Sequence, residues 1–319
     1  MENGIVRVEQ SEEATKRKKK RNMELNSVIE PIIDDPRGYS VKKVSGLSIL
    51  LQEFLIQAKK KNTIWTFAEA DITDALDKLK KHKEKTGESI SFTAFLITVF
   101  ARVVALHKEP MNSMLKKGRE LYTFQDVDVS TNIERSFPDG TKKPISYTIR
   151  KANEKTLREI SDELRDAMVA KAKTATNAGK KKGWIKWVIK RMDKLPGWIR
   201  RALLNKMFND PILKKNAMGT VNVTAVGMAG TGMGKMIHLT PHCLSMGVGG
   251  IEELPFCIDG KVLPRKLVGI TFAMDHDVID GAPAARFFHD IRQWLMYFCH
   301  NPEFDWCFKS LENSPPKTE

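Results

Sequence analysis

Cysteine is scarce in this chain of 319 residues, which has Cys243, Cys257, Cys299 and Cys307. None of the four belongs to a C-x-x-C pair, so the usual zinc and redox motifs are excluded, and four scattered thiols do not make a disulfide scaffold. The N-terminus has no apolar stretch typical of a signal peptide, and the strongest apolar run, residues 92–106, is too short to span a bilayer. We therefore expect a cytoplasmic protein without a metal site.

Acidic residues are outnumbered by basic ones, and the formal net charge is +14. Two stretches hold this excess: residues 16–21 carry six positive charges, and residues 180–206 carry ten Lys or Arg against one acid, Asp193. The rest of the chain is nearly neutral. The excess positive charge lies outside the expected folded core, and no sequence motif for recognising nucleic-acid bases accompanies it. We therefore expect that nucleic acid is not a partner.

The composition divides the chain into a folded domain and two tails. Residues 1–38 combine many charges with few aromatic side chains, so we expect a disordered basic tail there and a flexible C-terminal tail at 314–319. Residues 39–313 are expected to form one domain. Within it, residues 172–215 form a basic, tryptophan-rich insert that the Pro196-Gly197 pair splits into two short amphipathic helices.

Hydrophobic periodicity predicts a mixture of helices and strands. The predicted helices are 47–59, 73–85 (with Thr73 as its cap), 92–106, 154–171 and 282–299, and the predicted strands are 63–72, 120–124, 127–133, 143–149, 219–226, 243–251 and 267–273. Strands and helices do not alternate regularly. This order favours an α+β or mixed α/β fold over a doubly wound sheet.

Residues 267–288 (LVGITFAMDHDVIDGAPAARFF) carry the strongest chemical signal. An apolar strand leads into His276, and Asp280 follows four residues later, before a helix. A histidine fixed at a strand end, with a carboxylate that can set its tautomer, suits general acid–base catalysis. By spacing alone, however, the pattern favours a histidine that merely completes a strand-to-helix turn.

The stretch DHDVIDGAPAARFF resembles the signature of the catalytic domain of the dihydrolipoamide acyltransferases, the core of the 2-oxo acid dehydrogenase complexes. It also resembles the H-x-x-x-D-G motif of chloramphenicol acetyltransferase. Other stretches resemble the same family in the same order: FAEADITDAL, PMNSML, residues 129–159 and GTVNVTAVG. The resemblance spans roughly residues 39–300. It implies a chloramphenicol-acetyltransferase-like mixed α/β fold, a sheet flanked by helices, that forms a homotrimer.

The resemblance also implies acyl transfer from a thioester at sites that lie between two subunits, with His276 supplied by one of them. His276 would be the base that takes a proton from the acceptor thiol. Thr224 falls where the family carries the serine that stabilises the oxyanion, although an ordinary strand residue is the alternative. Asp280 would mainly hold the turn behind His276.

Three features depart from the family pattern. Asp277 stands where the family has arginine, and its carboxylate could raise the pKa of the His276 imidazole or point to solvent. Only about 38 residues precede the domain, so we expect no covalently attached lipoate.

The acyl donor would then be external, most simply acyl-coenzyme A (CoA). The acceptor would be a separate lipoyl protein or a small thiol, amine or alcohol. The insert could lie on an anionic membrane, pack on the trimer, or attract the phosphates of CoA.

A catalytically weak trimeric scaffold, held at a membrane surface by residues 180–206, is the alternative function.

Other motifs give only weak evidence for a functional site. GMAGTGMGK (227–235) lacks the spacing of a phosphate-binding loop. Pro241 argues against a metal site at His238 and His242, and Cys243 has no base near it in the sequence.

Overall fold

The computed structural model describes residues 31–35, 38–42, 46–136, 142–169, 196–225, 234–258 and 260–300. The chain divides into two compact units that interleave in the sequence. The first unit draws its described residues from the stretches 1–54 and 182–201, and the second from 55–181 and 202–319.

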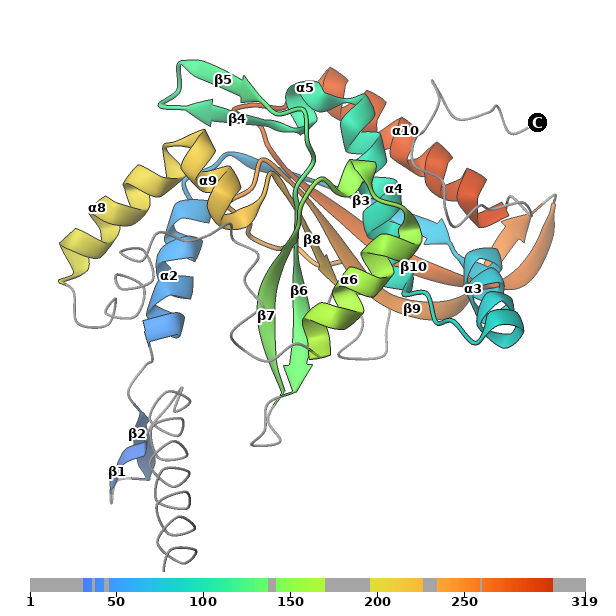
Figure 1. Cartoon of the computed structure of the whole chain (residues 1–319), viewed down its shortest axis with the longest axis horizontal. Coiled ribbons are helices and arrows are strands. Elements are labelled where there is room, and N and C mark those ends of the chain that lie inside the picture. Colours follow the sequence, from blue (N-terminus) through green and yellow to red (C-terminus); the bar gives the residue numbers. More distant parts are fainter. Residues whose placement is uncertain are drawn as a thin grey trace, which may run out of the picture. The chain divides into compact units, whose positions relative to one another are not determined.

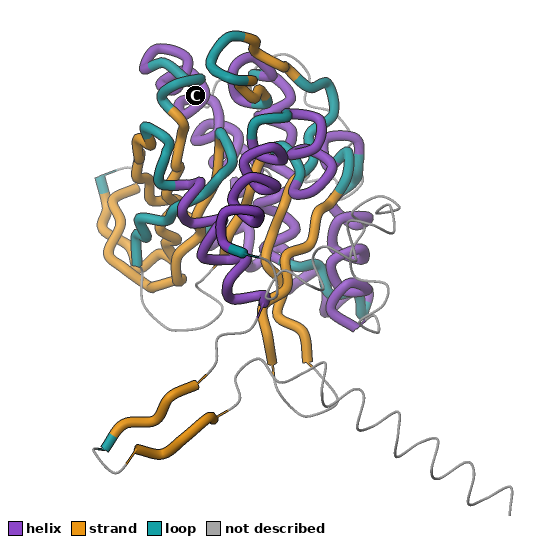
Figure 2. Tube along the Cα trace, turned by 90° about the vertical axis from the view of Figure 1, so that its left-hand side faces the viewer, coloured by secondary structure: helices purple, strands orange, loops and turns teal. Residues whose placement is uncertain are grey.

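The first unit contains an antiparallel hairpin of β1 (Pro31–Asp35) and β2 (Tyr39–Lys42), seen in Figure 2. β1 precedes Tyr39, where we expected the ordered chain to begin, and its two isoleucines favour a strand. Helix α2 (Gly46–Ala58) and helix α8 (Gly197–Phe208) both begin in this unit. Glu53 of α2 is buried and lies 3.7 Å from Arg201 of α8.

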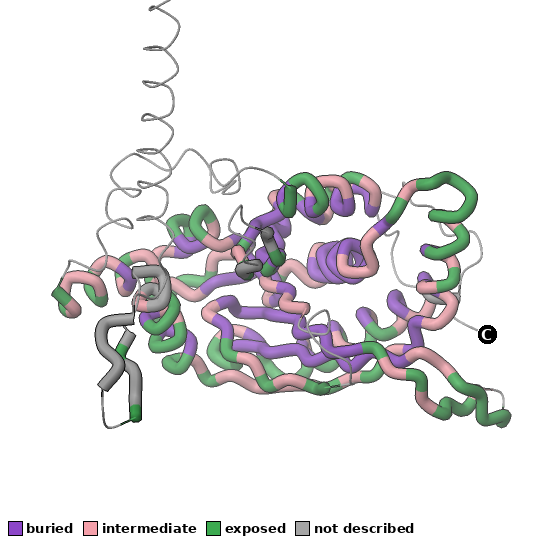
Figure 3. Tube along the Cα trace, turned by 90° about the horizontal axis from the view of Figure 1, so that it is seen from below, coloured by how far each residue is buried: buried purple, intermediate pink, exposed green. Residues whose placement is uncertain are grey.

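The second unit is built on a six-stranded mixed sheet with the order β3-β10-β9-β8-β6-β7. The strands are β3 (Thr63–Asp71), β6 (Val129–Ser136), β7 (Lys142–Ile149), β8 (Val221–Ala225), β9 (Leu244–Ile258) and β10 (Lys261–Asp275). β8 runs parallel to β6 and β9, and the other neighbours are antiparallel. β9 and β10 extend beyond the apolar runs that predicted them, because their pairing continues into a hairpin whose end is exposed (Figure 3).

Three helices pack against one face of this sheet: α4 (Phe92–Leu106), α6 (Leu157–Val169) and α10 (Gly281–His300) (Figure 1). Figure 3 shows the buried residues between the helical layer and the sheet. The aromatic rings of Phe100, Phe272 and Phe287 join α4, β10 and α10, with centroids 5.9–6.3 Å apart. The predicted mixed sheet flanked by helices is therefore confirmed.

Shorter elements connect these layers. They are α3 (Thr73–Thr86), α5 (Lys108–Met111), β4 (Ser113–Lys116), β5 (Glu120–Thr123), the 3₁₀ turn η1 (Ala152–Glu154) and α9 (Pro211–Met218). The prediction that Thr73 caps α3 was wrong, since Ile72 holds the cap position and makes no side-chain bond there. Thr73 instead donates from its backbone N and its Oγ1 to Asp71 Oδ1, at 3.0 and 2.7 Å.

Some predicted segments lie outside the described residues. They are most of the basic tail, the last two residues of the predicted helix 154–171, residues 172–195 of the insert, residues 226–233, and the chain beyond 300. The described part of the insert begins at Pro196 and forms α8 and most of α9. In the parts of the chain that the structure describes, no helix has the length and apolar character needed to cross a membrane.

Candidate active site

His276 directly follows the last residue of β10 and lies in the turn that leads to α10. Its backbone N donates to the carbonyl O of Asn62 at 2.8 Å. Just beyond it, the backbone N atoms of Val278 and Ile279 donate to the carbonyl O of Asp275, at 3.0 and 2.9 Å. The imidazole side chain is 47% exposed. The turn therefore fixes the backbone of His276 while leaving the ring open to an incoming substrate.

Asp280 faces the imidazole from the start of α10. Its Oδ1 lies 3.9 Å from His276 Nδ1, and its side chain is 86% exposed. This distance exceeds that of a hydrogen bond, and so exposed a pair is strongly screened. The Asp280 carbonyl accepts from the backbone N of Ala284 at 3.0 Å, which begins the helix. Asp280 thus lies on the Nδ1 side of the ring without a hydrogen bond to it.

A buried ion pair holds the strand end immediately before His276. Lys61 Nζ donates to Asp275 Oδ2 at 2.5 Å and to the carbonyl O of His242 at 3.1 Å. The backbone N of Asp275 donates to the carbonyl O of Cys243 at 2.8 Å. Burial acts to lower the pKa of Lys61, but the neighbouring Cys243 and Asp275 outweigh it and raise that pKa above its ordinary value. The turn behind His276 is therefore held mainly by Asp275, and the side chain of Asp280 contributes less than we expected.

Two more titratable groups lie beside this pair. Lys214 of α9 is 5% exposed, and burial together with the charge of Lys61 lowers its pKa to about 8. His242 is 4% exposed, and burial lowers its pKa to about 3. His242 Nε2 donates to the carbonyl O of Met218 at 2.9 Å, and Nδ1 lies 3.1 Å from Thr240 Oγ1. His242 is accordingly a neutral, structural residue.

The structure also shows the surroundings of His238 and Cys243, which the sequence analysis did not favour as functional residues. His238 Nε2 lies 2.8 Å from Ser245 Oγ, away from His242, and the described residues hold no group of three possible metal ligands. Cys243 Sγ lies 3.8 Å from Lys61 Nζ, a neighbour that the sequence could not reveal. The thiol is 2% exposed, so a substrate could not reach it. The stretch 227–235 falls largely outside the described residues.

Asp277 points towards the loop that connects α2 with β3. Its Oδ1 accepts a hydrogen bond from Asn62 Nδ2 at 2.8 Å, and the side chain is exposed. Of the two sequence-based alternatives, the structure places this carboxylate against Asn62 at the surface. The substitution for the family arginine therefore adds a second link, beside the backbone bond of His276, between this turn and Asn62.

Thr224 lies on β8, two strands across the sheet from β10, the strand that leads into His276. The strand register pairs Thr224 with Gly247 of β9, and Gly247 with Thr271 of β10. His276 lies five residues beyond Thr271. With a rise of roughly 3.4 Å per residue and roughly 4.8 Å between strands, Thr224 and His276 are roughly 20 Å apart in one chain.

This separation decides which predicted residues can act together. A general base and an oxyanion donor must both contact the same reacting group, each within hydrogen-bond distance. The structure brings His276 and Asp280 together in one chain but keeps Thr224 apart from both. A site that uses all three residues requires a second copy of the chain.

Comparison with protein families gives a match to the 2-oxoacid dehydrogenases acyltransferase (catalytic domain) family over residues 36–183 and 212–302. The chain therefore belongs to this family. The residues between the two matched stretches, 184–211, fall inside the segment that we treat as an insert.

One relative is the dihydrolipoyllysine-residue acetyltransferase component of the pyruvate dehydrogenase complex of Mycoplasma pneumoniae. It is 27% identical over 227 residues, which cover 68% of this chain and 46% of that protein. The chain thus spans less than half the length of this relative.

Solved structures share the fold. A probable dihydrolipoamide acetyltransferase of Listeria monocytogenes matches with a TM-score of 0.56 at 18% identity, over 85% of this chain and 96% of that one. The dihydrolipoamide acetyltransferase of Azotobacter vinelandii matches with a TM-score of 0.55 at 21% identity, over 83% and 96%.

Proposed function

We propose that this chain transfers an acyl group from an external thioester, acyl-CoA, to a thiol, at sites formed by two copies of the chain. The observation that carries this proposal is the spacing of three residues. The Azotobacter vinelandii enzyme was studied for the catalytic role of a serine, a histidine 52 residues later and an asparagine four residues after that. Thr224, His276 and Asp280 have these same intervals.

His276 is the base in this proposal. Its Nε2 takes the proton from the S–H of the acceptor thiol, and the thiolate attacks the thioester carbonyl. The resulting oxyanion accepts a hydrogen bond from the Thr224 hydroxyl of another copy. When the intermediate collapses, the C–S bond to CoA breaks, and the CoA thiolate takes the proton back from the imidazolium. Asp280 lies too far from Nδ1 for a hydrogen bond within one chain, and its part in this proposal is to begin α10 directly behind the turn that holds His276.

A closed trimer is the assembly that we propose, because a threefold ring lets every copy give His276 to one site and Thr224 to another. The acceptor that we propose is the dihydrolipoyl group of a separate protein, by analogy with relatives named for that residue. Small thiols are the alternative acceptors. The basic residues of α8, Arg200, Arg201 and Lys206, would attract the phosphates of CoA.

The test is an assay of acyl-CoA with dihydrolipoamide, in which the acylated product is quantified by mass spectrometry. His276→Ala should lower kcat at least about 10³-fold, and Thr224→Ala about 10²–10³-fold, while Thr224→Ser keeps most of the activity. Asp277→Asn is the matched control, since it changes a neighbouring carboxylate that faces Asn62. Equal rates for wild type and His276→Ala would refute the mechanism and favour the scaffold alternative.

A further inference from the structure

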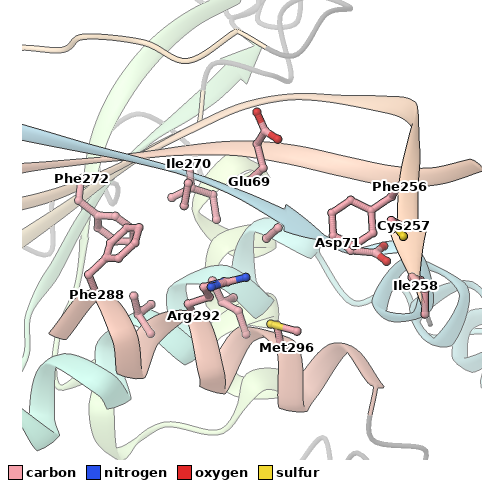
Figure 4. A pocket seen from close by; sticks show the side chains of 14 residues that line it. Glu69, Asp71, Phe256, Cys257, Ile258, Ile270, Phe272, Phe288, Arg292 and Met296 are labelled. Carbon is pink, nitrogen blue, oxygen red and sulfur yellow. The ribbon is translucent and has the colours of Figure 1, made fainter. Parts of the chain in front are cut away.

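A cavity of about 290 Å³ lies between α10, the ends of β3 and β9, and the part of β10 around Ile270 and Phe272 (Figure 4). Its walls are mostly apolar. Phe272 and Phe288 lie at one end and Phe256 at the other. On β3, the small side chains of Ala68 and Ala70 line it, and they leave room that larger residues would fill.

The charged groups around this cavity are not equivalent. Glu69 pairs with Lys235 at 2.6 Å, and in Figure 4 it points away from α10. Asp71 is held by Arg265, whose Nε lies 2.6 Å from Oδ2. Arg292 differs, because within the described part of the chain no hydrogen bond or ion pair engages it. Figure 4 shows its guanidinium between α10 and the strands. The cavity thus combines apolar walls with one uncommitted cation.

We propose that this cavity binds a medium-chain carboxylate, with the chain between the aromatic and aliphatic walls and the carboxylate on Arg292. Small-ligand pockets are mostly apolar, with a few polar groups that orient the ligand, and this volume is at the lower end of their range. A planar guanidinium can donate two hydrogen bonds to one carboxylate. Each methylene that leaves water for such walls adds favourable transfer free energy. A short, amphipathic anion satisfies all three conditions.

The proposal uses only the cavity and Arg292, so it does not rest on acyl transfer. The two are nevertheless connected by β10. Phe272, in the wall of the cavity, precedes His276 by four residues, or roughly 13 Å along the strand. A bound carboxylate would therefore contact the strand that carries His276 at its end.

Binding can be measured by isothermal titration calorimetry on the full chain with octanoate, and with octanol and octylamine as neutral and cationic probes of the same length. We expect octanoate to bind most tightly. Arg292→Gln should weaken octanoate binding about tenfold or more and leave octanol nearly unchanged. Arg286→Gln is the matched control, because Arg286 is exposed on the same helix and does not line the cavity. Its affinity should stay within about twofold of wild type.

A second variant and a chemical probe locate the ligand. Ala70→Leu should fill the cavity and abolish binding. If this variant does not fold, Cys257, an exposed thiol in the cavity wall, replaces it as a probe: octanoate should slow its alkylation in the wild-type chain, as followed by mass spectrometry. His276→Ala must bind octanoate like wild type, since loss of binding there would place the ligand at the acyl-transfer site. No binding, equal affinity for octanoate and octanol, or unchanged binding in Arg292→Gln would each overturn the proposal.

Discussion

The roughly 20 Å between Thr224 and His276 leads to a prediction about mixtures of inactive chains. His276→Ala and Thr224→Ala should each be nearly inactive alone, because each removes one half of every site. Co-expressed, the two variants should regain activity. A chain that lacks the hydroxyl still supplies its imidazole to a site whose hydroxyl comes from the other variant.

The size of this recovery follows from counting sites. In trimers assembled at random from equal amounts of both variants, half of the chains keep His276 and half keep Thr224. About a quarter of the sites then combine one of each, so the mixture should reach about a quarter of wild-type kcat per site. If both residues acted within one chain, no site would hold both, and the mixture would be as inactive as its components.

The assay needs a different affinity tag on each variant, so that equal amounts of the two chains can be verified in the total pool of trimers, from which no species is removed. A second mixture is the control: wild type with the double variant His276→Ala/Thr224→Ala. It should give about a quarter of wild-type activity for a site between chains, and about half for a site within one chain. An inactive mixture of the single variants, with the control at half, would refute the separation of these residues.

Three further predictions concern the buried cluster beside His276, each measured by urea unfolding. Between about pH 8 and 10.5 the unfolded chain holds a proton on Lys214 that the folded chain releases, so the free energy of unfolding rises with pH over this range. Lys214→Met should remove this rise and should increase the free energy of unfolding by roughly 3 kcal/mol at pH 7. As the pH falls from about 6.5 towards 3, the unfolded chain takes up a proton that buried His242 cannot, so His242→Gln should lose less stability over that range. Lys61→Met should cost about 3–5 kcal/mol because Asp275 stays buried without its cation, and adding Asp275→Asn should recover part of that loss; equal stability of all three proteins would contradict the ion pair.

The amino-acid sequence by itself determined many of the helices and strands, and it identified His276 as the candidate catalytic base. The all-round apolar stretch 92–106 predicted a buried helix, and α4 has these bounds. The run of apolar residues before Asp275 predicted the strand that leads into His276. Such features are local, since the period of the apolar residues fixes the element and its buried face. The resemblance to the family rested on the same short, ordered motifs.

Only the tertiary structure decided which distant residues meet. Lys61 belongs to a run of three lysines that resembles an ordinary solvated segment, yet the pairing of Thr63 with Asp275 buries it in an ion pair. The pairing of Thr224 with Gly247 and Thr271 places that hydroxyl far from His276, although the two lie in motifs of one family. Arg292 is exposed on α10 like an ordinary helical arginine, and only the tertiary structure places it in the wall of a cavity beside the ends of β3 and β9. Sequence periodicity states which face of an element is buried, but the register between strands depends on contacts across the whole domain.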